Sequence, residues 1–173
     1  MPVDERSRET ITRSDLKRLA RLAREEREDF FGRHPEWSML YRRRMLASAL
    51  CGDAALHYLN GTTGIPEFEV WTFYAQHPEA PYPPHRVSHR DFGRSRFGCL
   101  PDQQAYAGRR VVLTGRSLDC APGDPPVEVL QRYLRRGETP SARELRDKAV
   151  VLIEPEDSLG YIVWPTLLVG SSQ

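Results

Sequence analysis

The hydrophobic residues of this chain change their spacing near residue 65, and this change predicts a domain that combines helices with a sheet. Upstream, leucines and alanines recur at intervals of three and four over residues 16–23. This spacing is typical of an amphipathic helix, which we predict over residues 14–32. Downstream, aromatic and β-branched residues crowd into residues 68–74 and predict a largely buried strand that begins near Ile65.

The same patterns predict the remaining elements. Ser14 is placed to cap the first helix, and Ser141 with Glu144 has the spacing of a capping box at the last one. Prolines break regular structure, so we expect residues 76–90 to form a loop with extended pieces. We predict further helices over residues 36–50, 53–59, 126–134 and 141–149, and further strands over residues 109–114 and 159–163.

Length and charge limit the range of functions. The chain has 173 residues and a formal net charge of +1, which suits one domain and gives no general attraction to polyanions. We assign residues 14–173 to that domain and expect residues 1–13 to form a flexible N-terminus. The three cysteines have no metal-binding spacing, and no apolar run reaches the roughly 20 residues of a membrane span. We therefore expect a cytoplasmic protein without membrane contact.

Two acidic residues on the predicted strand carry the clearest chemical signal. Glu67 and Glu69 are separated by one residue, and side chains alternate across a strand, so both carboxylates are expected on one face. Paired carboxylate oxygens suit Mg²⁺, which takes its other ligands from water and from substrate phosphates. The pair predicts a magnesium site for phosphoryl-transfer chemistry. The alternative is an exposed face of an edge strand.

A glycine motif upstream of this pair gives a resemblance to a known family. Cys51-Gly52-Asp53 is followed, after thirteen residues, by Glu67-Phe68-Glu69-Val70. Over residues 39–118 the chain resembles the nucleotidyltransferase superfamily of the DNA polymerase β type, in particular its minimal bacterial members. The resemblance implies an α/β (α+β) fold in which helices, including N-terminal ones, flank a mixed sheet.

The resemblance also implies roles for single residues. Glu67 and Glu69 would hold Mg²⁺ as the catalytic pair, and Gly52 and Asp53 would lie beside the phosphates of a nucleoside triphosphate. Arg94 or Arg96 would neutralise those phosphates, because arginine's planar fork binds phosphate well. The implied function is the transfer of a nucleotidyl group to an acceptor that the sequence does not identify.

Three departures from the family pattern favour a second hypothesis. Asp53 stands where the family has Gly or Ser and would repel phosphates unless a cation intervenes. Both acids are Glu rather than Asp, which places a cation less tightly. Val112 aligns with a third carboxylate and cannot bind a metal. The chain would then be a catalytically inactive member that binds a nucleotide or a protein partner. A Lys or Arg side chain paired with Glu67 or Glu69 would argue against an active enzyme.

Several candidate residues also have simpler interpretations. The arginines of residues 90–96 fit a surface turn that is held by Phe92 and Phe97. Nucleic-acid binding through these arginines is a third function, which is possible but not favoured. For Cys51 and His57 we expect packing rather than reactivity or metal binding.

Overall fold

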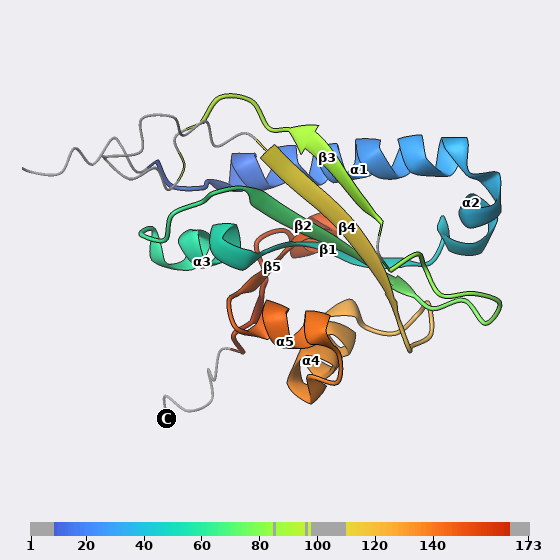
Figure 1. Ribbon diagram of the computed structural model, residues 1–173. Helices are drawn as coiled ribbons and strands as arrows, with labels where there is room; N and C mark the ends of the chain where they lie inside the picture. Colours follow the sequence, from blue (N-terminus) through green and yellow to red (C-terminus); the bar gives the residue numbers. More distant parts are fainter. Residues whose placement is uncertain (1–8, 85, 96, 98–109, 167–173) are drawn as a thin grey trace, which may run out of the picture.

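The computed structural model describes residues 9–84, 86–95, 97 and 110–166, which form a six-stranded sheet with helices on both faces (Figure 1). The helices are α1 (Arg13–Arg33), α2 (Pro35–Tyr41), α3 (Gly52–Asn60), α4 (Pro126–Arg136) and α5 (Pro140–Arg146). The strands are β1 (Met45–Cys51), β2 (Phe68–Ala75), β3 (Val87–Asp91), β4 (Arg110–Leu118), β5 (Val150–Glu154) and β6 (Ile162–Trp164). One 3₁₀ turn, η2 (Glu156–Ser158), connects the last two strands.

The strand order determines which parts of the chain meet. The sheet runs β3-β4-β2-β1-β5-β6; β2 and β4 are parallel, and the other neighbouring pairs are antiparallel. Glu69 of β2 is aligned with Cys51 of β1 on one side and with Val112 of β4 on the other. The end of β1 and the starts of β2 and β4 therefore lie together.

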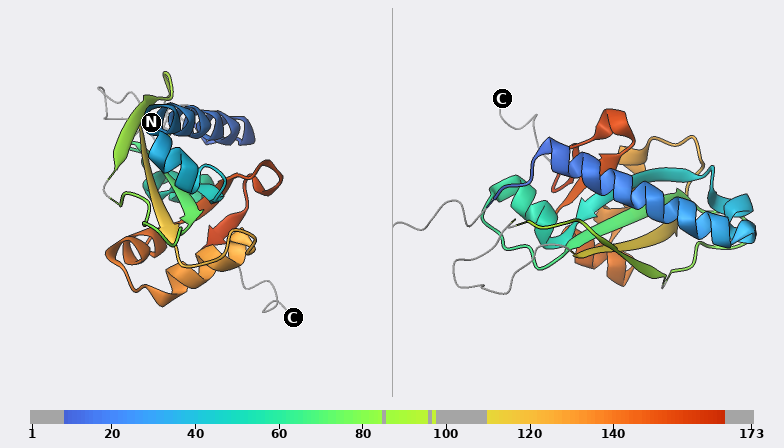
Figure 2. Two further views of the ribbon diagram at one scale, coloured as in Figure 1. Left: turned by 90° about the vertical axis from the view of Figure 1, so that its right-hand side faces the viewer. Right: turned by 90° about the horizontal axis from the view of Figure 1, so that it is seen from above.

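The two faces of the sheet have separate apolar cores. α1 and α3 cover one face, and α4 and α5 cover the other (Figure 2). Phe68 packs on the α1 side, whereas Phe73 packs on the α4 side, as expected from the alternation of a strand. This arrangement confirms the predicted class, a mixed sheet flanked by helices with further helices at the N-terminal end. Within the described part of the chain, each helix is too short or too polar to cross a lipid bilayer.

The first helix is confirmed, with its cap two residues earlier than predicted. Thr12 and Asp15 form a capping box, in which the Thr12 hydroxyl accepts from Asp15 N at 3.3 Å and Asp15 accepts from Thr12 N at 2.8 Å. Ile11 is buried, so the segment that we expected to be flexible includes a core residue. Residues 1–8 of that segment lie outside the described residues.

The helix predicted over residues 36–50 is wrong. α2 ends at Tyr41, and the second half of this segment is strand β1. Every residue of β1 after Met45 is buried, because the strand lies inside the sheet with helices on both faces. Such a strand has a continuous apolar run, and apolar residues such as Leu46 and Leu50 fit a helical spacing equally well.

Other elements show smaller differences. β3 begins inside the predicted loop and ends just beyond it, at Asp91, and as an edge strand it lacks the apolar alternation that would reveal it. β5 is absent from the predicted elements. The last predicted helix runs to residue 149, directly before β5 begins at Val150. α5 ends at Arg146 and is capped by Thr139, not by the predicted Ser141–Glu144 box. The other predicted helices and strands are present with shifted ends.

A buried ion pair joins α1 to the sheet. Arg27 donates hydrogen bonds to the two carboxylate oxygens of Glu154, at 2.6 and 2.9 Å, and a third to Ser48 Oγ at 3.2 Å. Ser48 in turn shares a 2.9 Å hydrogen bond with Thr72. Burial lowers the pKa of Arg27, but the hydrogen bond and charge of Glu154 outweigh burial and raise this pKa above its usual value. The guanidinium therefore stays charged inside the protein.

Candidate functional site

A cavity of about 600 Å³ lies on the α4/α5 face of the sheet, where β1, β2 and β4 meet. Its size is within the roughly 300–1,000 Å³ that is common for ligand sites. The parallel strands β2 and β4 contribute Glu69, Trp71, Val112 and Thr114 by alternation. Glu67 also lines the cavity, but it lies in the bend directly before β2, which begins at Phe68 and not near Ile65 as predicted. Gly52 lines it at the start of α3, and the end of α5 and the residues after it contribute Glu144, Leu145, Asp147 and Lys148.

Gly52 is required where β1 turns into α3. Its φ is +67°, a left-handed conformation that favours glycine. A Cβ atom at this position would lie 2.5 Å from Glu69 Oε2. The backbone therefore approaches the carboxylate more closely than any other residue type would allow.

We expect Gly52→Ala to lower the free energy of unfolding by about 1–2 kcal/mol from the left-handed backbone alone. The added methyl group would also displace the Glu69 carboxylate from its hydrogen bond with Trp71, so the tryptophan fluorescence should change. Urea denaturation and emission spectra measure both effects. Gly32→Ala in α1, where a Cβ meets nothing within 4 Å, is the matched control. A Gly52→Ala protein with wild-type stability and spectrum would contradict the close approach.

Glu67 and Glu69 both line the cavity, and each has a partner. Glu67 Oε2 lies 3.1 Å from Arg110 Nη2, and Glu69 Oε1 accepts a 2.8 Å hydrogen bond from Trp71 Nε1. The side chains of Arg110 and Glu67 are 63% and 40% exposed, so solvent screens their attraction. The pairing of Glu67 with an arginine is nevertheless the arrangement that argues against an active enzyme.

Asp53 is neutralised by a lysine that is distant in sequence. Lys148 Nζ lies 2.9 Å from Asp53 Oδ1. The hydrogen bond with Asp53 raises the pKa of Lys148 and outweighs its partial desolvation, and the charges of Asp53, Glu69 and Glu144 raise it further. Asp53 lies in the first turn of α3 and is not its N-cap, which is Cys51. The repulsion of phosphates expected from Asp53 is therefore offset by the ammonium group.

Val112 lies beside Glu69, at the position where the resemblance would place a third carboxylate. Val112 is directly aligned with Glu69 in the parallel pair and lines the same cavity. Among the described residues, no three His, Cys, Asp or Glu side chains come together as a metal-binding group. On the strands, the cavity therefore has Val112 beside Glu69, and its further carboxylates, Glu144 and Asp147, come from the end of α5 and the residues after it.

The structure does not bring the predicted arginines into the cavity. Arg94 is exposed and is absent from the cavity lining, and Arg96 lies outside the described residues. Phe92 and Phe97 pack against Phe68 on the α1 side of the sheet, with ring centroids 4.8 and 6.0 Å away. The turn that carries Arg94 is thus held on the opposite face from the two glutamates.

Cys51 and His57 are packed, as expected. Cys51 is fully buried, and burial, together with the nearby charge of Glu69, raises the pKa of its thiol well above the usual value. The ring nitrogens of His57 face the carbonyl oxygens of Thr63 and Glu9, at 2.8 and 3.0 Å. His57 therefore connects α3 to the chain on both sides of it.

The sequence does not assign the cavity's polar residues Trp71, Glu144, Asp147 and Lys148 to the site, nor Thr114, Pro84, Val87 and Leu145. Trp71 follows Glu67 and Glu69 in the same period of two, so strand alternation could have placed it on their face. Glu144, Asp147 and Lys148 have no such signal, because the packing of α5 on the sheet brings them to the cavity.

Comparison of the chain with protein-family models, with curated proteins and with solved structures finds no match.

Proposed function

We propose that this cavity binds a nucleoside triphosphate together with Mg²⁺, and that the chain is a nucleotidyltransferase-like protein that does not transfer the nucleotide. The observation that carries the proposal is the placement of Gly52, Glu67, Glu69 and Val112 around one cavity. The first three are the residues for which the resemblance implies phosphate and metal contacts. The fourth replaces the carboxylate that would complete the catalytic set.

The charge of the cavity supports a requirement for the cation. Its lining includes the carboxylates of Glu67, Glu69, Glu144 and Asp147 and the ammonium group of Lys148. Because carboxylates outnumber ammonium groups, a free triphosphate would be repelled. Binding is therefore expected with a divalent cation and not without it.

The residues present fit Mg²⁺ in part. Mg²⁺ is commonly held by one or two carboxylates, with phosphate oxygens and water as its other ligands. Glu67 and Glu69 would supply the carboxylates and the nucleotide would supply the phosphates. When bound, the cation would neutralise the triphosphate beside the acids, and Lys148 would keep Asp53 from repelling it.

Calorimetric titration tests the proposal. We expect one or more Mg-nucleoside triphosphates to bind the wild type, with affinity reduced at least about tenfold in Glu67→Gln/Glu69→Gln and in the absence of Mg²⁺. The control is Glu25→Gln/Glu28→Gln, which removes two exposed carboxylates from α1 and should bind as the wild type does. Equal binding by the two double variants would exclude the cavity as the site.

Nucleotidyl transfer is the second candidate function. It is favoured by one observation, that Glu67 and Glu69 line the same cavity of about 600 Å³. Release of pyrophosphate from a Mg-nucleoside triphosphate in the presence of acceptor mixtures, abolished in Glu67→Gln/Glu69→Gln, would establish it. A titration without any nucleotide binding would instead favour a protein partner.

The proposed activity is a cytoplasmic one. The proposal rests on the three cysteines, which have no metal-binding spacing, and reduced thiols are usual in the cytoplasm.

A further inference from the structure

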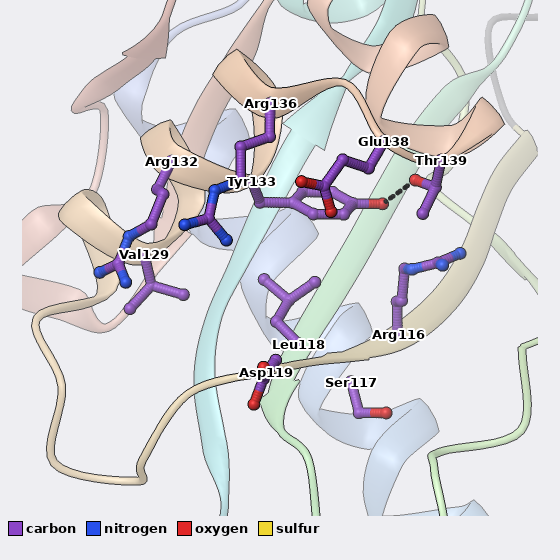
Figure 3. Close-up of a pocket in the computed structure, with 10 residues that line it drawn as sticks. All are labelled: Arg116, Ser117, Leu118, Asp119, Val129, Arg132, Tyr133, Arg136, Glu138 and Thr139. Carbon is purple, nitrogen blue, oxygen red and sulfur yellow. Dashed lines mark hydrogen bonds between the residues drawn. The ribbon is translucent and has the colours of Figure 1, made fainter.

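A second cavity lies farther along β4, on the same face of the sheet as the first. It has a volume of about 190 Å³ and lies between the end of β4 and helix α4. Figure 3 shows Arg132, Tyr133 and Arg136 extending from α4 and Arg116 from β4 around it. Because drug-sized ligands need at least roughly 300 Å³, this cavity is limited to a small molecule.

The arginines of this cavity are largely without partners. Arg116 donates a 3.3 Å hydrogen bond to Ser141 Oγ, and its guanidinium lies 5.8 Å from the centroid of the Tyr133 ring. Among the described residues, neither Arg132 nor Arg136 forms an ion pair or a side-chain hydrogen bond. Three guanidinium groups thus line a small hollow, and those of Arg132 and Arg136 are exposed to solvent and have no protein partner among the described residues.

α4 places Glu128, Arg132 and Arg136 at successive intervals of four residues. Arg136 lies in the last turn of α4, where a cation is favoured by the helix dipole. Arg132 lies one turn earlier on the same side of α4, and like charges four residues apart destabilise a helix. An anion between the two side chains would convert this repulsion into attraction.

The other lining groups indicate the size and polarity of that anion. Leu118, Val129 and the ring of Tyr133 provide an apolar surface, and the Tyr133 hydroxyl is held by Thr139 at 3.0 Å (Figure 3). Asp119 and Glu138 also line the cavity, so its charged side chains sum to a small positive charge. The anion must therefore carry enough charge to engage several arginines, together with a small apolar group.

We propose that this second cavity is a binding site for a small organic phosphate. A phosphate group carries up to two negative charges and three oxygens that accept from the forked donors of Arg116, Arg132 and Arg136. Its apolar substituent would lie against Tyr133, Val129 and Leu118.

The second site is separate from the proposed nucleotide site. The described residues that line the two cavities have no member in common. α5 lies between them, because its Ser141 bonds to Arg116 of the second cavity and its Glu144 lines the first. Phosphate binding in the second cavity therefore does not depend on nucleotide binding in the first.

The test is an NMR titration of the ¹⁵N-labelled full chain with phenyl phosphate in the absence of Mg²⁺. We expect saturable shifts of the Arg116, Arg132 and Arg136 side-chain Nε–H signals. Arg132→Gln and Arg136→Gln should each weaken binding by about tenfold or more, since each removes a charge-assisted contact. Arg135→Gln is the matched control on α4, because Arg135 is exposed and does not line the cavity. It should change the affinity by less than about twofold.

Two further titrations test whether the ligand is a phosphate and whether it binds in the second cavity. Benzoate, with the same ring and a single charge, should bind at least about fivefold more weakly, and equal affinity would overturn the assignment to phosphate. Glu67→Gln/Glu69→Gln should bind phenyl phosphate as the wild type does, so failure of the nucleotide proposal leaves this test unaffected. No saturable shift, an equal loss in Arg135→Gln, or shifts centred on Gly52 and Trp71 would overturn the second site.

Discussion

Val112→Asp is expected to raise the affinity of the first cavity for Mg²⁺ or Mn²⁺ by about tenfold or more, because it adds a third carboxylate beside the existing pair. Val112 is aligned with Glu69 in the parallel register, and side chains of aligned residues share a face. A new carboxylate at 112 would therefore lie next to that of Glu69 and point into the same cavity. Calorimetric titration of the cation measures the gain.

The control for this gain is Val112→Asn, which has nearly the same shape as Val112→Asp without its charge. In the absence of a cation, Val112→Asp should be the less stable of the two, because three carboxylates repel one another. Added Mg²⁺ should raise its melting temperature and leave that of Val112→Asn unchanged. Equal cation affinity in both variants would contradict the alignment of Val112 with a third ligand position.

Glu154→Ala is expected to lower the free energy of unfolding by about 3–5 kcal/mol, because it leaves the charge of Arg27 buried without a partner. The side chains of Arg27 and Glu154 are 11% and 10% exposed. For a chain of this length the loss corresponds to a fall in melting temperature of about 6–20 °C. Urea denaturation and calorimetry measure the two quantities.

The chain offers a matched control in the ion pair of Arg42 and Glu28. Its N–O distance is also 2.6 Å, but its side chains are 40% and 61% exposed. Glu28→Ala should cost about 0–1 kcal/mol, as is usual for a surface pair. The double variant Arg27→Leu/Glu154→Leu should be more stable than Glu154→Ala, since it buries no unpaired charge. A similar loss in Glu28→Ala and Glu154→Ala would contradict the effect of burial.

The part of the fold that the sequence predicts is the part with local signals. α1 has a clear period of 3.6, and β2 has a dense run of aromatic and β-branched residues, so both are predicted at nearly the correct place. β1 and β5 are buried on both faces and have no period, which is why β1 was assigned to a helix and β5 was missed. β3 is polar and depends on its pairing with β4.

The candidate site also has one part that local sequence predicts and one part that depends on tertiary packing. The alternation that places Glu69 and Trp71 on one face, and the turn at Gly52, follow from neighbouring residues and could be predicted. Glu67 reaches the same cavity from the residue before β2. The pairing of Asp53 with Lys148 spans 95 residues and depends on the packing of α5. Arg94 shows the opposite error, because the resemblance assigns it to the site but Phe92 and Phe97 hold it on the other face.

The position of β5 beside β1 determines when the sheet is completed during synthesis. Ser48 of β1 is aligned with Glu154, and Arg27 finds its carboxylate partner in the same residue. Until residue 154 has left the ribosome, one edge of β1 has no neighbouring strand. During that time Arg27 also has no carboxylate to neutralise its charge if it is buried. Closing contacts over such a separation costs chain entropy and slows folding. The N-terminal helix and the central strands therefore complete their core only after residue 154 has emerged.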